Sequence, residues 1–130
     1  MRRHLEIFYF KMKGYNKKLG QWGEQLAARF LIKKGFELVE TNYYCREGEI
    51  DLIFKFQDQI VFVEVKTRRS IKFGFGEDAV SFSKRLKLKQ AIEKYMMDKE
   101  INLCPRFDLV VVEIDKLTPK FIHFEAVSLE

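Results

Sequence analysis

The chain has 130 residues, of which 47% are hydrophobic, and it contains 13 Phe; this composition predicts one globular domain and excludes a largely disordered chain. No apolar run approaches the roughly 18–20 residues of a membrane-spanning helix, and the start lacks the apolar core of a signal peptide, so we expect a cytoplasmic protein without a membrane partner. The 24 Lys and Arg outnumber the 19 Asp and Glu, which gives a formal net charge of +5 and favours a polyanionic partner, nucleic acid first, although a merely lysine-rich protein would share this balance.

Helical and strand patterns follow one another along the chain in an order typical of an α/β sandwich. Residues 1–16 are predicted to be a poorly integrated N-terminal extension, in which disorder is left open, and residues 17–130 a single domain. Helical periodicity covers 19–34 and about 83–99, and strand patterns cover 36–45, 50–56, 60–67, 106–114 and 120–127. The order α-β-β-β-α-β-β predicts a central mixed β-sheet flanked by helices, and the sequence contains none of the glycine-rich motifs of nucleotide-binding folds.

The stretch EIDLIFKFQDQIVFVEVK, residues 49–66, places charged side chains inside two apolar strands. Side chains alternate between the two faces of a strand. One face then holds only apolar residues, namely Ile50, Leu52, Phe54, Phe56, Val61, Val63 and Val65. The other face holds Asp51, Glu64 and Lys66 together with Ile53, Ile60 and Phe62. We expect the first helix to cover this second face and to aim Glu24 at the charged patch.

The pairing of these two strands decides how close the charged side chains lie. A two-residue loop at residues 58–59 would put Lys66 opposite Asp51. A register shifted by two residues would put Glu64 opposite Asp51, and both alternatives stay open. Directly opposed residues have Cβ atoms about 4.5–5.5 Å apart, so Asp51, Glu64 and Lys66 share one patch in either register.

Carboxylates at such close range repel one another unless a cation lies between them or one takes up a proton. Mg²⁺ prefers oxygen ligands and usually keeps several waters, and it can polarise a phosphate and activate water. A lysine beside it can orient that water or offset charge on the phosphate. The patch therefore predicts metal-assisted hydrolysis of phosphodiesters, and the alternative is a solvated strand face whose Asp–Lys pair contributes about a few tenths of a kcal/mol.

The same residues resemble a known group of nucleases. Asp51 followed across a hairpin by Glu64-Val65-Lys66 resembles the PD-(D/E)xK superfamily. Four stretches resemble the YraN-type family of small predicted endonucleases: GQWGEQLAARFLIKKGF, TNYYCREGEIDLI, VFVEVKTRRSIKFGFGEDAVSFSKR and RFDLVVVE, which together span about residues 19–114. The resemblance implies a restriction-endonuclease-like fold, related to archaeal Holliday junction resolvases.

The resemblance also implies roles for individual residues. Asp51 and Glu64 would be ligands of Mg²⁺ or Mn²⁺, and the backbone carbonyl of Val65 would be a third. Lys66 would be the catalytic lysine, and Glu24 matches the helical glutamate that completes such sites. Metal dependence and DNA as the substrate class follow from the resemblance, and the basic charge agrees with them.

Basic residues around the patch are predicted to contact phosphate, although a solvated surface is the alternative for each. They are Arg46, Arg68, Arg69, Lys84 and Arg85, and Lys84 matches a basic position of the family. The resulting hypothesis is a metal-dependent DNA endonuclease acting on linear or branched DNA, with selectivity for branched or damaged structures as a further hypothesis. A non-catalytic DNA-binding or repair-accessory module and an RNA nuclease are the alternatives, and a homodimer is left open.

Overall fold

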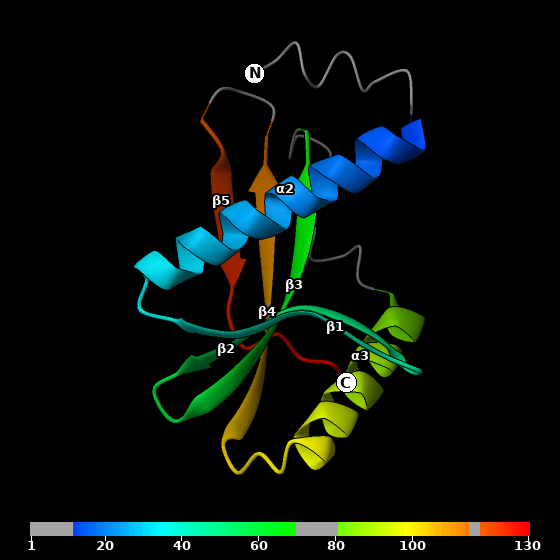
Figure 1. Cartoon of the computed structure of the whole chain (residues 1–130), viewed down its shortest axis with the longest axis vertical. Coiled ribbons are helices and arrows are strands. Elements are labelled where there is room, and N and C mark those ends of the chain that lie inside the picture. Colours follow the sequence, from blue (N-terminus) through cyan, green and yellow to red (C-terminus); the bar gives the residue numbers. More distant parts are fainter. Residues whose placement is uncertain (1–11, 70–80, 115–117) are drawn as a thin grey trace.

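The computed structural model describes residues 12–69, 81–114 and 118–130, with side chains described from residue 17 onward. Two helices flank one five-stranded sheet (Figure 1). The helices are α2 (Met12–Lys33) and α3 (Phe82–Asp98), and the strands are β1 (Glu37–Cys45), β2 (Gly48–Phe56), β3 (Gln59–Arg68), β4 (Cys104–Glu113) and β5 (Lys120–Phe124). The predicted α/β sandwich, with its mixed sheet and its order of elements, is confirmed.

The strands lie in the sheet in their chain order, β1-β2-β3-β4-β5. Only β3 and β4 are parallel, and the other three neighbouring pairs are antiparallel. Parallel neighbours need a long crossover connection, and α3 lies within the segment that joins β3 to β4. The first three strands therefore form an antiparallel meander, and the crossover that contains α3 lets β4 run in the same direction as β3.

Each face of the sheet is covered by a different helix. On one face, α2 packs against a core that includes Leu52, Phe54 and Val63. On the other face, α3 packs against Ile53 and Phe62, with Ile60 in the same cluster. The prediction that the first helix covers Ile53, Ile60 and Phe62 is therefore wrong. The sheet has two apolar faces, and the periodicity of a helix does not say which of them it covers.

The two-residue turn of the β2–β3 hairpin lies one residue earlier than predicted. Phe56 pairs with Gln59, so the turn residues are Gln57 and Asp58 rather than 58–59. Gln57 takes a left-handed backbone conformation, φ 57°, which suits the twist of a two-residue hairpin. The observed pairing follows the alternative register, in which Asp51 comes opposite Glu64.

The β1–β2 hairpin bends where Asn42 lies opposite Asp51 in the register. Asn42 has a left-handed φ of 50°, a conformation that Asn tolerates better than most residues. Ile50 packs on the α3 side of the sheet although Leu52, two residues along β2, packs on the α2 side. The alternation of faces thus breaks at Asp51, and Figure 1 shows the curved hairpin reaching toward α3.

The predicted boundary at residue 16 stays a prediction. Helix α2 begins at Met12, inside the predicted extension, while residues 1–11 lie outside the described part of the chain. Residues 70–80, between β3 and α3, also lie outside it. Neither described helix is long and apolar enough to cross a membrane.

Candidate active site

The carboxylate of Asp51 sits where β2 separates from β3. The ladder between these strands runs only as far as Leu52 and Val63. Beyond it, Asp51 Oδ2 accepts a hydrogen bond of 2.9 Å from the backbone N–H of Val65. The Asp51 side chain thus accepts the hydrogen bond of a β3 backbone N–H, which fixes the carboxylate beside the strand that carries Glu64.

Glu64 is almost fully buried and lies between two lysines. Its side chain is 5% exposed, and its Oε2 atom lies 3.2 Å from Lys84 Nζ and 3.7 Å from Lys66 Nζ. Lys84 belongs to the first turn of α3, whose start is capped by the Ser81 hydroxyl accepting from the Lys84 N–H at 3.2 Å. Lys84 is predicted from the sequence to contact phosphate, and the structure places it directly against Glu64 in the carboxylate patch.

Glu24 reaches the same region from α2. A methyl group at Gly23 would overlap Oγ1 of Thr67 and lie 3.0 Å from its Cβ and Cγ2, so the helix and β3 are in close contact just after Lys66. Glu24 Oε1 accepts a hydrogen bond of 3.0 Å from Asn42 Nδ2. Together with Val65 and Lys66 it lines a hollow of about 280 Å³.

Asn42 is a site residue that sequence reasoning missed. Its position opposite Asp51, its left-handed backbone and its bond to Glu24 link the first helix to the bend of the hairpin. Asn is depleted in strands, so an Asn between Thr41 and Tyr43 in a strand pattern was a readable sign of an irregularity. The partner of its side chain could not be read from the sequence.

The electrostatics of the patch favour protonated carboxyl groups. Burial and the neighbouring charges of Glu64 and Glu24 raise the pKa of Asp51 to about 8. The hydrogen bond from Val65 and the charge of Lys84 lower it, but by less. Burial also raises the pKa of Glu24; the bond from Asn42 opposes this, and Glu49 and Glu64 add to it. Unfavourable carboxylate charge at one place is the condition that a divalent cation relieves.

The donor set fits a hard divalent cation bound through few protein ligands. Within the described part of the chain, no three His, Cys, Asp or Glu side chains form a group ready to hold a metal. Asp51 and Glu64 supply two carboxylates on adjacent strands, with the Val65 carbonyl between Glu64 and Lys66. Mg²⁺ is commonly held by one or two carboxylates with water completing its octahedron, so two carboxylates meet its needs.

The basic residues predicted to contact nucleic acid surround the patch unevenly. Lys84 lines a hollow of about 380 Å³ together with Asp51 and Glu64, and Arg68 lines the hollow that holds Lys66. Arg46 and Arg69 are exposed, in the β1–β2 turn and just after β3. Arg85 is half-buried on α3, and its Nε is a buried atom without a hydrogen-bond partner among the described residues. Contact of these residues with nucleic acid stays a prediction.

A separate buried cluster supports the sheet away from the carboxylate patch. Asp108 is fully buried and accepts bonds from Arg106 at 2.7 and 2.9 Å and from the Ala126 N–H at 3.0 Å, and it lies 2.8 Å from His123 Nε2. Burial opposes ionisation, yet the bonds from His123, Arg106 and Ala126 hold the pKa of Asp108 below its usual value. Arg106 and His123 are therefore both partners of Asp108.

Comparison with protein families assigns the chain at a coarse level. Residues 23–112 match the model of the uncharacterised protein family UPF0102. The chain belongs to this family. A UPF0102 protein of Caldicellulosiruptor bescii is 47% identical over 104 residues, which cover 76% of this chain and 85% of the relative. UPF0102 proteins of Syntrophomonas wolfei (52% over 117 residues, 88% of this chain and 85% of the relative) and Caldanaerobacter subterraneus (45% over 111 residues, 82% and 91%) are also similar.

The UPF0102 match spans the elements that build the candidate site. It begins at Gly23, beside Glu24, and ends within β4, so Asp51, Glu64 and Lys66 all lie inside it. The names of these relatives state no activity, substrate or cofactor. The function of this UPF0102 member must therefore be argued from the site.

Proposed function

We propose that this UPF0102 protein is a metal-dependent DNA endonuclease of the PD-(D/E)xK superfamily, which hydrolyses phosphodiester bonds. The observation that carries the proposal is the pair of carboxylates at the point where β2 leaves β3. Asp51 is buried strongly enough to raise its pKa to about 8, and Glu64 lies on the adjoining strand with Lys66 next to it. Groups whose pKa is shifted by burial and by a like charge are typical of functional sites.

The proposed roles follow from the positions of the side chains. Asp51, Glu64 and the Val65 carbonyl would hold Mg²⁺ or Mn²⁺. The bound ion would act as a Lewis acid that polarises a phosphate oxygen and promotes ionisation of water. Lys66, at 24% exposure of its side chain, is open enough to orient that water or to neutralise the developing charge, and Glu24 would bind or orient water from the helical side.

The charge around the site supports a polyanionic substrate. Lys84 and Lys87 line the hollow that contains both carboxylates, and Arg68 lines the adjacent one with Lys66. Such residues contact phosphates and set the affinity and its salt dependence without reading sequence. The whole chain carries a net charge of +5, which agrees with DNA as the substrate.

A DNA-binding module without cleavage is the second candidate, and one observation favours it. Glu64 already has two lysine neighbours, Lys84 at 3.2 Å and Lys66 at 3.7 Å, so its charge is compensated without a metal. In this alternative the ion pairs hold α3 against β3, and the basic residues bind phosphate. This alternative does not explain why a second carboxylate, that of Asp51, lies next to Glu64.

The two candidates are separated by a cleavage assay on labelled linear, flap and four-way-junction DNA and matched RNA, with Mg²⁺, Mn²⁺ or EDTA. We expect cleavage of DNA with metal only, and loss of at least about a hundredfold in rate for Asp51→Asn and Glu64→Gln, as for groups of an active site. The exposed Asp58→Asn and Glu93→Gln are matched controls that keep full activity.

Two results would contradict the nuclease. Cleavage that survives in both Asp51→Asn and Glu64→Gln would locate the activity elsewhere or in a contaminant. Binding of DNA with a steep salt dependence but no cleavage under any metal condition would favour the binding module. Preferential cleavage of RNA would change the substrate class but leave the site in place.

A further inference from the structure

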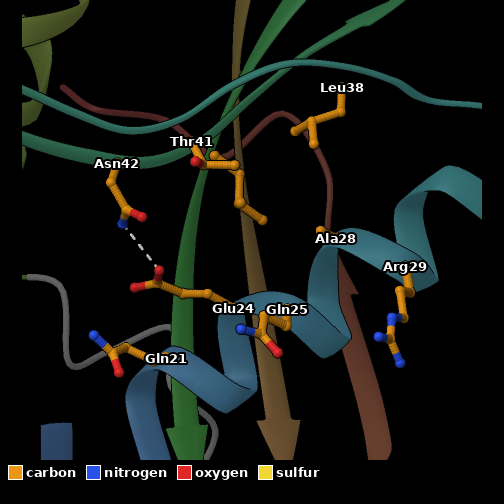
Figure 2. Close-up of a pocket in the computed structure, with 9 residues that line it drawn as sticks. Gln21, Glu24, Gln25, Ala28, Arg29, Leu38, Thr41 and Asn42 are labelled. Atoms are coloured by element: carbon orange, nitrogen blue, oxygen red, sulfur yellow. Dashed lines mark hydrogen bonds between the residues drawn. The ribbon is translucent and has the colours of Figure 1, made fainter. Parts of the chain in front are cut away.

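A larger hollow lies between α2 and β1, on the side of Glu24 away from Lys66. Its volume is about 550 Å³. Figure 2 shows Gln21, Gln25 and Arg29 along α2, with Leu38, Thr41 and Asn42 facing them from the hairpin. The three α2 residues are four positions apart and exposed, so they form one stripe along the helix.

The backbone of β1 creates the opposite wall. A bulge between Leu38 and Glu40 shifts the register, so Leu38 and Thr41 both lie on the α2 side although they are three residues apart. Asn42 follows with a left-handed φ of 50°, and it lines the same hollow as its neighbour Thr41. The bulge and the left-handed residue together direct three side chains of β1 toward one hollow: Leu38, Thr41 and Asn42.

The chemistry of this hollow differs from that of its two neighbours. Three side-chain amides and one hydroxyl supply both donors and acceptors, while Leu38, Ala28 and Leu52 supply apolar surface. The charged lining residues are one acid, Glu24, and one base, Arg29. The hollows beside it contain Lys84 and Lys87 or Lys66 and Arg68, so cationic side chains are concentrated next to the carboxylates and the larger hollow has little net charge.

The hollow borders the candidate active site at Glu24. This side chain lines both the large hollow and the smaller one that holds Val65, Lys66 and Arg68. Asn42, bonded to Glu24 at 3.0 Å, lies opposite Asp51 in the strand register. A group seated in the hollow would therefore be adjacent to the residues proposed to act on the phosphate.

We propose that this hollow binds one unpaired nucleobase of the DNA, next to the phosphate that is cleaved; the inference rests on the proposed function. Side-chain amides form paired hydrogen bonds with base edges, and an arginine guanidinium together with an apolar side chain can stack on a base. A base held in a duplex offers neither a free face nor its pairing edge. The hollow would thus make the enzyme selective for DNA that contains unpaired nucleotides, such as a bulge or a flap.

Binding in EDTA tests the inference without any metal or turnover. The two probes are a duplex with one bulged fluorescent adenine analogue and the same duplex with that analogue paired. We expect wild type to bind the bulged probe about tenfold more tightly, the scale of one good base contact, and to change its fluorescence. The double variant Gln21→Ala/Gln25→Ala should lose this preference while its affinity for the paired probe stays unchanged.

Two further variants make the test specific. Ala28→Phe fills the hollow and should also abolish the preference for the bulged probe. If this half-buried position does not tolerate the larger ring and the variant fails to fold, Gln21→Ala/Gln25→Ala still tests the inference. Gln90→Ala, an exposed glutamine of α3, is the matched control and should behave as wild type. Equal affinity of wild type for both probes, or a preference that survives in the double variant, would overturn the inference.

The outcomes also separate this inference from the nuclease. Metal-dependent cleavage that requires Asp51 but treats bulged and paired DNA alike would keep the nuclease and reject the base site. A bulge preference that depends on Gln21 and Gln25, without cleavage in any metal, would keep the base site and reject the nuclease. Absence of DNA binding in EDTA together with absence of cleavage under every metal condition would reject both.

Discussion

Gly23 and Gly20 lie one turn apart in α2, yet a methyl group has opposite consequences at the two positions. At Gly20 a Cβ would meet no atom within 4 Å, whereas at Gly23 it would overlap the Thr67 side chain of β3. Gly23→Ala must therefore push α2 away from β3 or force Thr67 out of its position. Gly20→Ala adds the same methyl to the same helix without a neighbour, and it is the natural control.

The expected difference follows from a comparison of the two variants. Replacing Gly by Ala inside a helix stabilises it by about 0.5–1 kcal/mol, and this gain is common to both. Overpacking costs about 1–3 kcal/mol and applies to Gly23→Ala alone. Gly20→Ala should thus be more stable than wild type by about 0.5–1 kcal/mol, and the free energies of unfolding of the two variants should differ by about 1–3 kcal/mol.

Urea denaturation of both variants, with unchanged m values, measures this difference. The double variant Gly23→Ala/Thr67→Ala removes the two outer atoms that the methyl meets, so the penalty should largely disappear in a double-mutant cycle that includes Thr67→Ala. Equal stability of Gly20→Ala and Gly23→Ala, or a penalty unaffected by Thr67→Ala, would refute the close contact between α2 and β3. Since that contact positions Glu24, we also expect Gly23→Ala to slow any cleavage.

Substitutions at three further residues, Asp51, Asn42 and Asp108, test the site and its support. Folding raises the pKa of Asp51 from 3.8 to about 8, so between these pH values the folded protein keeps a proton that the unfolded chain loses, and the stability of wild type falls as the pH rises. Asp51→Asn should therefore be about 1–3 kcal/mol more stable than wild type near pH 8 and equal to it near pH 4. A stability difference that does not depend on pH, measured by urea titration, would contradict this. Asn42→Gly and Asn42→Ala both lose the bond to Glu24, but only Ala is strained at φ 50°, by about 1–2 kcal/mol; thermal unfolding should rank Ala below Gly, and both should lose activity. Asp108→Asn should cost about 3–5 kcal/mol, because Asp108 is fully buried and forms an ion pair with Arg106. The exposed Asp58→Asn should change stability by less than about 0.5 kcal/mol. Similar melting temperatures of the two variants would show that the buried cluster is not coupled to folding.

The alternation of apolar residues was sufficient to predict the β2–β3 hairpin and the association of Asp51 with Glu64. A period of two is a strong signal when one face is continuously apolar, as in Val61, Val63 and Val65. The register was the weaker part, because it depends on the turn. Gln57 takes a left-handed conformation that its residue type does not demand, and this moves the pairing by two residues.

Other features depend on contacts between distant parts of the chain, and local periodicity does not predict them. Both helices have an apolar side, so the sequence did not decide that α3, rather than α2, covers Ile53 and Phe62. The bend at Asn42 and Asp51 reverses which face Ile50 lies on, although Ile50 has the same parity as Leu52. The hydrogen bond between Glu24 and Asn42 joins residues 18 positions apart, so it could be recognised only from the folded structure.

The contrast between the two carboxylates is the strongest argument against a purely binding role. Glu64 has two lysine neighbours and would be tolerated as an ordinary buried ion pair. For Asp51, burial and the repulsion from Glu64 outweigh the bond from Val65 and the attraction of Lys84, so its charge is costly in the free protein. A surface that only binds phosphate gains nothing from a second carboxylate, since its ionisation weakens the fold. An arrangement that lowers stability at one position is expected where that position serves catalysis or a bound cation, and the raised pKa of Asp51 supports such a role in the proposed nuclease.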